Sequence, residues 1–109
     1  MTYKILCVCN HGNVRSACMA RLLKDSGHEA IAIGAEFTTE ESMLHFVHWA
    51  DKTIWMSEKK KVSDFRAFDT LNKENRIIIF NVGLDKWFHP FHPELIGLCN
   101  EALIEWGFR

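Results

Sequence analysis

One short segment, CNHGNVRS from Cys9 to Ser16, carries residue types that suit chemistry on an anion. Arg15 stands six positions after Cys9, and Ser16 follows directly. A thiolate is a strong nucleophile, a planar guanidinium can hold two oxygens of a phosphoryl group, and a serine hydroxyl can donate a hydrogen bond to the cysteine sulfur. The segment therefore predicts a phosphate-binding loop with Cys9 as nucleophile and Arg15 as anion clamp.

The residues inside this segment suit a loop that turns its backbone amides inward. Gly12 accepts a positive φ freely, and Asn13 tolerates one. Successive N–H groups can then surround phosphate oxygens, and a helix that begins at the end of the loop adds a positive potential that also favours a thiolate. The predicted phosphate-binding residues are Asn10, His11, Gly12, Asn13, Val14, Arg15 and Ser16.

The segments around the loop are predicted to be a strand and a helix. Residues 3–9 form a nearly continuous apolar run, typical of a strand covered on both faces, and residues 16–26 carry apolar side chains at helical spacing before Gly27. Thr38 and Glu41 form a capping-box pair ahead of a second helix, and Pro93 suits the first turn of the last one. Further strands are predicted at 29–34, 53–57 and 76–82, with a weakly periodic helix at 58–68.

Strands that alternate with helices predict an α/β fold with a parallel sheet covered on both faces, and we expect four strands in the order 2-1-3-4. In such a sheet the loop after the first strand lies beside the switch in strand order, where ligands bind. The elements thus place Cys9 and Arg15 where a substrate is expected.

Length and composition set the wider limits. The 109 residues suit one domain spanning 1–109, and the net charge of −1 favours neither a nucleic acid nor an anionic membrane as partner. Neither a secretory signal nor a spanning segment is recognised, so a cytoplasmic location is expected. In that setting the four cysteines are interpreted as free thiols.

Two other patterns are weaker. Cys7, Cys9 and His11, with His89 and His92, lack the regular spacing of zinc ligands, so no metal and no cofactor is expected. The lysines at 59–61 stand beside acidic residues, which favours a solvated helix face over a nucleic-acid contact.

The loop resembles that of the low-molecular-weight protein tyrosine phosphatase family, in which a cysteine, five residues, an arginine and a serine follow the first strand directly. The resemblance continues in family order through ILCVCNHGNVRS, the IGA of 33–35, WADKTIWMSEKK at 49–60 and DKWF at 85–88, and covers most of the chain. It implies a flavodoxin-like three-layer sandwich and a metal-free hydrolysis of phosphate monoesters, such as protein phosphotyrosine or a small aryl phosphate, through a cysteinyl-phosphate. The chain departs from the family at Gly12, Val14 and Lys86, where asparagine, a second cysteine and proline are usual.

Further roles are predicted outside the loop. Asp85 corresponds to the family's general acid, with His89 and His92 as alternative proton donors and a solvated turn residue as the plainer interpretation of Asp85. Trp87 and Phe88, with Phe37 opposite, would line a slot for a flat aromatic substrate, although each could instead pack in the core.

Three alternatives to a phosphatase share this size and topology. An arsenate reductase needs two further downstream cysteines, and only Cys99 follows Cys18. A phosphocarrier does not need an arginine clamp, so Arg15 and Ser16 argue against it. A catalytically idle module that binds phosphorylated partners is permitted by the departures at Gly12 and Lys86. The sequence does not indicate the oligomeric state.

Overall fold

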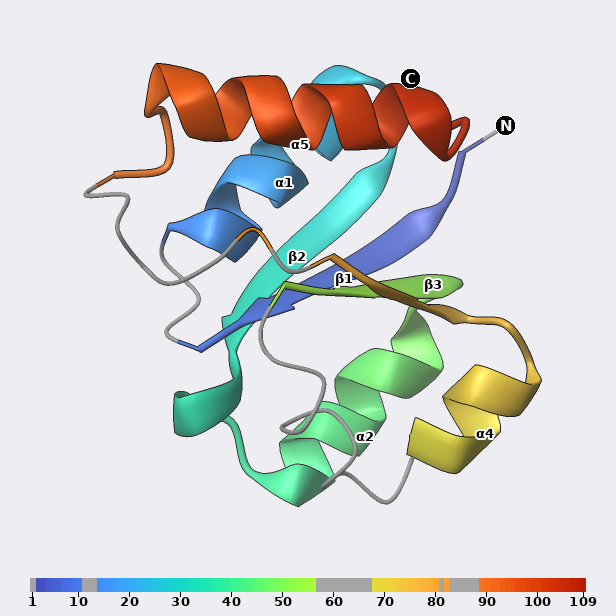
Figure 1. Ribbon diagram of the computed structural model, residues 1–109. Coiled ribbons are helices and arrows are strands. Elements are labelled where there is room, and N and C mark those ends of the chain that lie inside the picture. Colours follow the sequence, from blue (N-terminus) through green and yellow to red (C-terminus); the bar gives the residue numbers. More distant parts are fainter. Residues whose placement is uncertain (1, 11–13, 57–67, 81, 83–88) are drawn as a thin grey trace.

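The computed structural model describes residues 2–10, 14–56, 68–80, 82 and 89–109, which form a three-layer α/β sandwich (Figure 1). One parallel sheet contains β1 (Lys4–Cys9), β2 (Glu29–Gly34), β3 (Lys52–Trp55) and β4 (Ile77–Ile79), in the order β2-β1-β3-β4. Helices α1 (Arg15–Asp25) and α5 (Pro93–Glu105) cover one face, and α2 (Glu40–Trp49) and α4 (Phe68–Lys73) cover the other. The predicted fold class and strand order are both confirmed.

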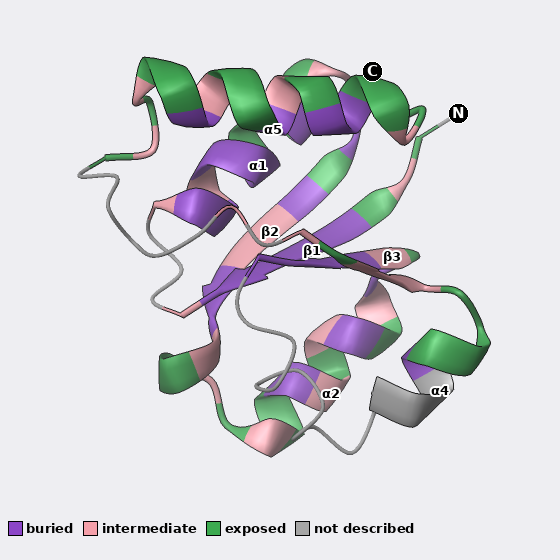
Figure 2. Ribbon diagram, in the orientation of Figure 1, coloured by how far each residue is buried: buried purple, intermediate pink, exposed green. Residues whose placement is uncertain are grey.

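Strand β1 lies in the middle of the sheet because its side chains are apolar on both faces. Ile5, Cys7 and Cys9 belong to the core cluster beneath α1 and α5, whereas Leu6 and Val8 belong to the cluster against α2. All five side chains are at most 1% exposed, and Figure 2 shows β1 buried along most of its length. Alternation along the strand therefore directs Cys9 to the same side as Cys7 and α1.

The two ends of the described chain are joined through a buried histidine. The backbone N–H of Tyr3 donates to Nδ1 of His28 at 3.1 Å, and Nε2 of His28 lies 2.8 Å from the carbonyl oxygen of Phe108. Because Nδ1 accepts, Nε2 must carry the proton and donate to Phe108. This pair of bonds fixes the start of β1 against the segment that follows α5.

Some element boundaries differ from the prediction. The side chain of Thr39, not Thr38, caps α2 by accepting a hydrogen bond from the N–H of Ser42 at 3.1 Å, while the hydroxyl of Thr38 donates to the carbonyl of Gly34 at 2.7 Å. Leu98 of α5 is 37% exposed. Strand β4 is shorter than expected, and the helix predicted at 58–68 falls outside the described residues except at its last position.

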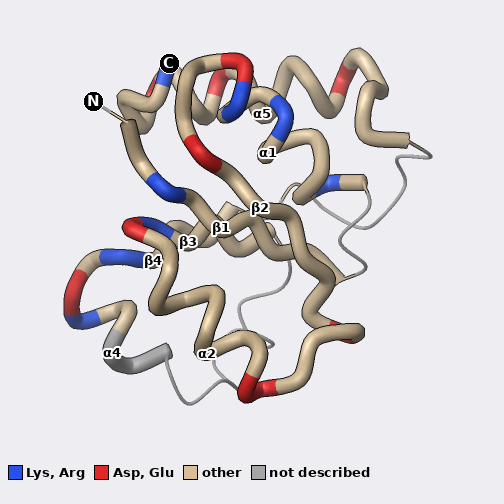
Figure 3. Tube along the Cα trace, turned by 180° about the vertical axis from the view of Figure 1, so that it is seen from behind, with Lys and Arg blue, Asp and Glu red and all other residues tan. Residues whose placement is uncertain are grey.

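Charged residues of both signs are interspersed around the outside of the described molecule (Figure 3). None of the helices in the described residues is long and apolar enough to cross a membrane.

Candidate active site

The site begins where β1 ends. Cys9 is the last residue of β1 and pairs with Gly34, the last residue of β2, while Val8 pairs with Trp55, the last residue of β3. The connection after β2 and the connection after β3 therefore leave the sheet on opposite sides of Cys9. This is the switch in strand order at which doubly wound sheets bind ligands.

Ser16 contacts the sulfur of Cys9. The distance from Cys9 Sγ to Ser16 Oγ is 3.1 Å, and both side chains are buried. The same hydroxyl lies 3.5 Å from the carbonyl oxygen of Ile33. When Cys9 is protonated, its thiol can donate to the Ser16 hydroxyl while that hydroxyl donates to the carbonyl of Ile33. When Cys9 is a thiolate, its sulfur can accept the hydrogen bond from the Ser16 hydroxyl instead. Ser16 thus has a hydrogen-bonding arrangement for either protonation state of Cys9.

Arg15 is the first residue of α1 and is only 3% exposed. One guanidinium nitrogen donates to the carbonyl oxygen of Met56 at 2.9 Å, and the N–H of Met56 in turn donates to the carbonyl of Val8 at 2.7 Å. These bonds orient the guanidinium by joining it to the end of β3, and they hold that end beside β1.

The position of Arg15 runs against the electrostatics of its helix. The N-terminus of a helix carries partial positive charge, and burial further penalises a cation. Among the described residues no side chain caps this end of α1, and no acidic residue lies in its first turn. A buried cation at a helix N-terminus is locally unfavourable, and such unfavourable placements are typical of functional sites. An anion bound there would neutralise both the Arg15 guanidinium and the positive end of the helix.

The segment after β2 is hydrogen-bonded to the start of the loop. The N–H of Glu36 donates to the carbonyl of Asn10 at 3.0 Å, within the short 3-10 helix Ala35–Phe37. Phe37, a predicted rim residue, is 76% exposed at the end of that turn. The structure therefore places this aromatic ring on the surface of a segment that is joined to the loop.

The structure brings together some of the predicted site residues and leaves others undescribed. Ser16 contacts the sulfur of Cys9, Arg15 precedes Ser16 at the start of α1, and Asn10 and Val14 flank these residues in the sequence. His89 and His92 lie before α5 with ring centroids 6.1 Å apart, and Nδ1 of His92 accepts a hydrogen bond from the N–H of Glu94 at 3.3 Å. The remaining predicted residues lie outside the described part of the chain: His11, Gly12, Asn13, Asp85, Trp87 and Phe88.

Sequence reasoning missed the backbone acceptors of the site. The carbonyls of Met56 and Ile33 orient Arg15 and Ser16, but a carbonyl is present at every residue and leaves no signal in a sequence. Within the described residues, no group of three histidine, cysteine or acidic side chains is arranged to hold a metal ion.

Comparison with protein-family models gives no match, and comparison with curated proteins gives none either. Among solved structures the chain matches the YwlE arginine phosphatase from Geobacillus stearothermophilus, with a TM-score of 0.61 over 96% of this chain and 93% of that one. The two chains share one fold. Sequence identity is 16%, so the match concerns the fold, and it confirms at that level the resemblance to low-molecular-weight protein tyrosine phosphatases.

Proposed function

We propose that this chain is a cysteine-dependent phosphatase of the low-molecular-weight protein tyrosine phosphatase type, acting on phosphate monoesters through a cysteinyl-phosphate. The observation that carries the proposal is the buried Arg15 at the positive end of α1, next in sequence to Ser16, whose hydroxyl lies 3.1 Å from the Cys9 sulfur. A cation, a helix N-terminus and a nucleophile at one point suit a phosphoryl group.

In the first step the thiolate of Cys9 attacks phosphorus. The S–P bond forms as the bond from phosphorus to the leaving oxygen breaks, and the leaving oxygen takes a proton from a general acid. Arg15 stabilises the charge on the equatorial oxygens, and the Ser16 hydroxyl stabilises the sulfur as nucleophile and later as leaving group. In the second step water attacks phosphorus and gives a proton to the group that served as general acid in the first step. The S–P bond breaks, and phosphate and the Cys9 thiolate are released.

We assign the general acid to Asp85, since it is the only carboxylate between β4 and the start of α5 at Pro93. His92 is a weaker candidate because one of its ring nitrogens already accepts a bond from Glu94 at the start of α5. The Asp85→Asn substitution should lower the rate of alkyl phosphate hydrolysis far more than the rate of aryl phosphate hydrolysis. An alkoxide is the poorer leaving group and depends more on protonation by the general acid.

Two substrate classes fit the proposal. The exposed ring of Phe37, on a turn bonded to the loop, supports a flat aromatic substrate such as protein phosphotyrosine, with Trp87 and Phe88 as further rim residues. The fold match to an arginine phosphatase supports phosphoarginine as an alternative to a monoester; it is a phosphoramidate, in which the bond from phosphorus to nitrogen breaks and the nitrogen takes the proton. Both classes use the same nucleophile and clamp.

The test is a comparison of kcat/KM for a small aryl phosphate, a phosphotyrosine peptide, a phosphoarginine peptide and an alkyl phosphate, each with and without a metal chelator. We expect turnover of the aryl phosphate and the phosphotyrosine peptide that the chelator leaves unchanged and that Cys9→Ser abolishes. A higher kcat/KM for the phosphoarginine peptide would make phosphoarginine the proposed substrate and would leave the cysteinyl-phosphate mechanism unchanged. Tight phosphopeptide binding without turnover would favour an idle binding module.

A further inference from the structure

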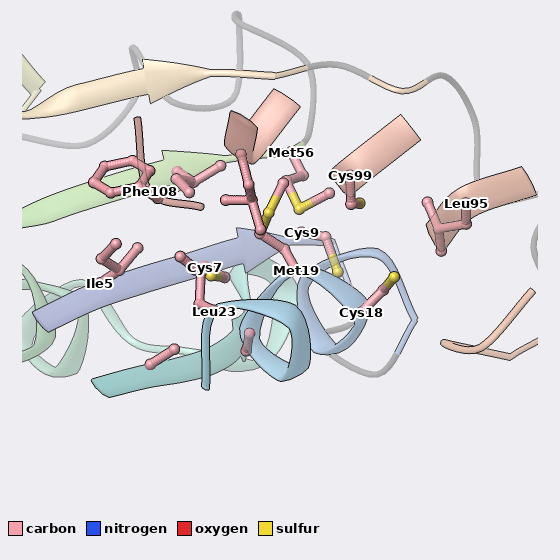
Figure 4. Close-up of a cluster of buried hydrophobic side chains, with 14 residues drawn as sticks. Ile5, Cys7, Cys9, Cys18, Met19, Leu23, Met56, Leu95, Cys99 and Phe108 are labelled. Atoms are coloured by element: carbon pink, nitrogen blue, oxygen red, sulfur yellow. The ribbon is translucent and has the colours of Figure 1, made fainter. Parts of the chain in front are cut away.

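The four cysteines of the chain all lie in the core cluster between the sheet and the helices α1 and α5 (Figure 4). Cys18 comes from α1 and Cys99 from α5, two helices that pack directly against each other. Their side chains are 1% and 0% exposed, and their thiols are hydrogen-bonded to one another. Two buried thiols from different helices thus form a contact pair, separate from Cys9 and its partner Ser16.

The two members of the pair differ in acidity. The hydrogen bond from Cys99 lowers the pKa of Cys18, whereas donating that bond, together with burial, raises the pKa of Cys99. Burial also raises the pKa of Cys7, which keeps that neighbour in the neutral thiol form. Cys18 is therefore the more acidic member of the pair, and Cys99 is its hydrogen-bonded neighbour.

The Cys18 side chain, although 1% exposed, forms part of the wall of a cleft. This cleft of about 240 Å³ lies between α1 and the start of α5 and is also lined by Arg21, Leu22, Asp25, Phe91 and Ile96. The Arg21 guanidinium lies 6.0 Å from the centre of the Phe91 ring and 3.2 Å from a carboxylate oxygen of Asp25. The wall of this cleft beside Cys18 thus carries an arginine that is ion-paired with Asp25.

We propose that Cys18 and Cys99 are a peroxide-sensitive dithiol that closes into a disulfide between α1 and α5. The Cys18 thiolate attacks one oxygen of hydrogen peroxide, the O–O bond breaks, and the products are a Cys18 sulfenic acid and hydroxide, which takes up a proton to become water. Cys99 then attacks the Cys18 sulfur, forming the S–S bond and releasing a second water. Two thiols and one peroxide give one disulfide and two waters, and a thiol reductant reverses the change.

The disulfide would join α5 to the helix that carries the site. Cys18 lies within the first turn of α1, three residues after Arg15, so the bond fixes the helix that carries Arg15 and the Ser16 that contacts Cys9. The reaction does not use Cys9. The dithiol is thus a modification site beside the proposed catalytic residues, and its formation is independent of whether the chain is a phosphatase.

The test is peptide mapping of the unmodified chain after exposure to a few equivalents of hydrogen peroxide, with remaining free thiols alkylated under denaturing conditions. We expect a cross-linked peptide that joins Cys18 to Cys99, with the loss of two hydrogen atoms, and its disappearance on treatment with dithiothreitol. A Cys9→Ser background repeats the measurement without oxidation at the proposed nucleophile. In Cys99→Ala, we expect a sulfenic acid at Cys18 that dimedone traps.

The matched control is Cys7→Ala, which removes the other buried thiol near Cys99 and should leave the cross-link intact. A cross-link through Cys7 or Cys9 in place of Cys18, or alkylation of both Cys18 and Cys99 after Cys9 has been oxidised, would overturn the proposal. The mapping of the unmodified chain separates these outcomes even where a variant fails to fold.

Discussion

The two faces of the sheet differ in the kinds of side chain that they bury. The face beneath α1 and α5 carries all four cysteines and the Ser16 that contacts Cys9, whereas the described core against α2 and α4 contains none of the cysteines. That second cluster consists of aliphatic, methionine and tryptophan side chains: Leu6, Val8, Ile33, Met43, Val47, Ala50, Trp55 and Leu71. One strand, β1, supplies both faces by alternation, so a single segment provides the proposed nucleophile on one side and aliphatic core residues on the other.

Two arginines show the same contrast. Arg76 donates to the carbonyls of Val47 and Ala50, at 3.0 and 2.7 Å, at the C-terminus of α2, where the helix favours a cation. Arg15 also donates to a carbonyl, that of Met56, but Arg15 itself lies at the N-terminus of α1, where the helix disfavours a cation. We infer that Arg76 stabilises the fold, while Arg15 is retained for an anion.

The largest effect is therefore expected from exchanging lysine for each arginine in turn. Arg15→Lys should lower kcat/KM for an aryl phosphate by about a hundred- to a thousandfold, because lysine cannot form the planar two-point contact. Arg76→Lys should leave kcat/KM unchanged and lower the free energy of unfolding by about 1 kcal/mol. Steady-state kinetics and denaturant unfolding measure the two effects. Equal loss of activity in both variants would contradict the division of roles.

The face against α2 and α4 is tested by removing a fully buried side chain from it. Leu6→Ala should lower the free energy of unfolding by about 2–5 kcal/mol, since Leu6 is 0% exposed and its removal leaves a cavity. The kcat of the protein that remains folded should stay the same. Urea unfolding followed by fluorescence measures the stability, and active-site titration gives the folded fraction. A large fall in kcat per folded molecule would show that this face also shapes the site.

A smaller effect is expected from the serine beside the nucleophile. Ser16→Ala should lower kcat by about ten- to a hundredfold, because the thiolate loses a hydrogen bond while Cys9 itself remains. The matched control is Ser26→Ala at the other end of α1, where the hydroxyl donates to the carbonyl of Leu22 at 3.0 Å. An unchanged kcat in Ser16→Ala, or an equal decrease in Ser26→Ala, would remove the thiolate-stabilising role.

The sequence predicted the features that depend on periodic apolar patterns or on residues close together in the chain. The strand order followed from periodicity and is confirmed, and the structure also contains the contact between the Cys9 sulfur and the Ser16 hydroxyl that the spacing suggested. The cap of α2 was placed one residue early, because adjacent threonines can serve equally and only the backbone path decides between them.

The pairing of Cys18 with Cys99 and the carbonyls that orient the site could not be predicted. Cys18 and Cys99 meet only because α1 packs against α5, and the bond from Arg15 to Met56 depends on where β3 ends beside β1. Such contacts join segments far apart in sequence, and neither residue type nor local spacing records them.

The most direct test of the central claim is to trap the phosphorylated intermediate. The enzyme is mixed with an excess of an aryl phosphate, denatured rapidly, digested and analysed by mass spectrometry, with Cys9→Ser as the control. We expect one phosphoryl group on the peptide that contains Cys9, together with a burst of the released phenol equal to the enzyme concentration. Turnover without a phosphorylated Cys9 peptide and without a burst, or a phosphoryl group on another residue, would contradict the proposed role of Cys9.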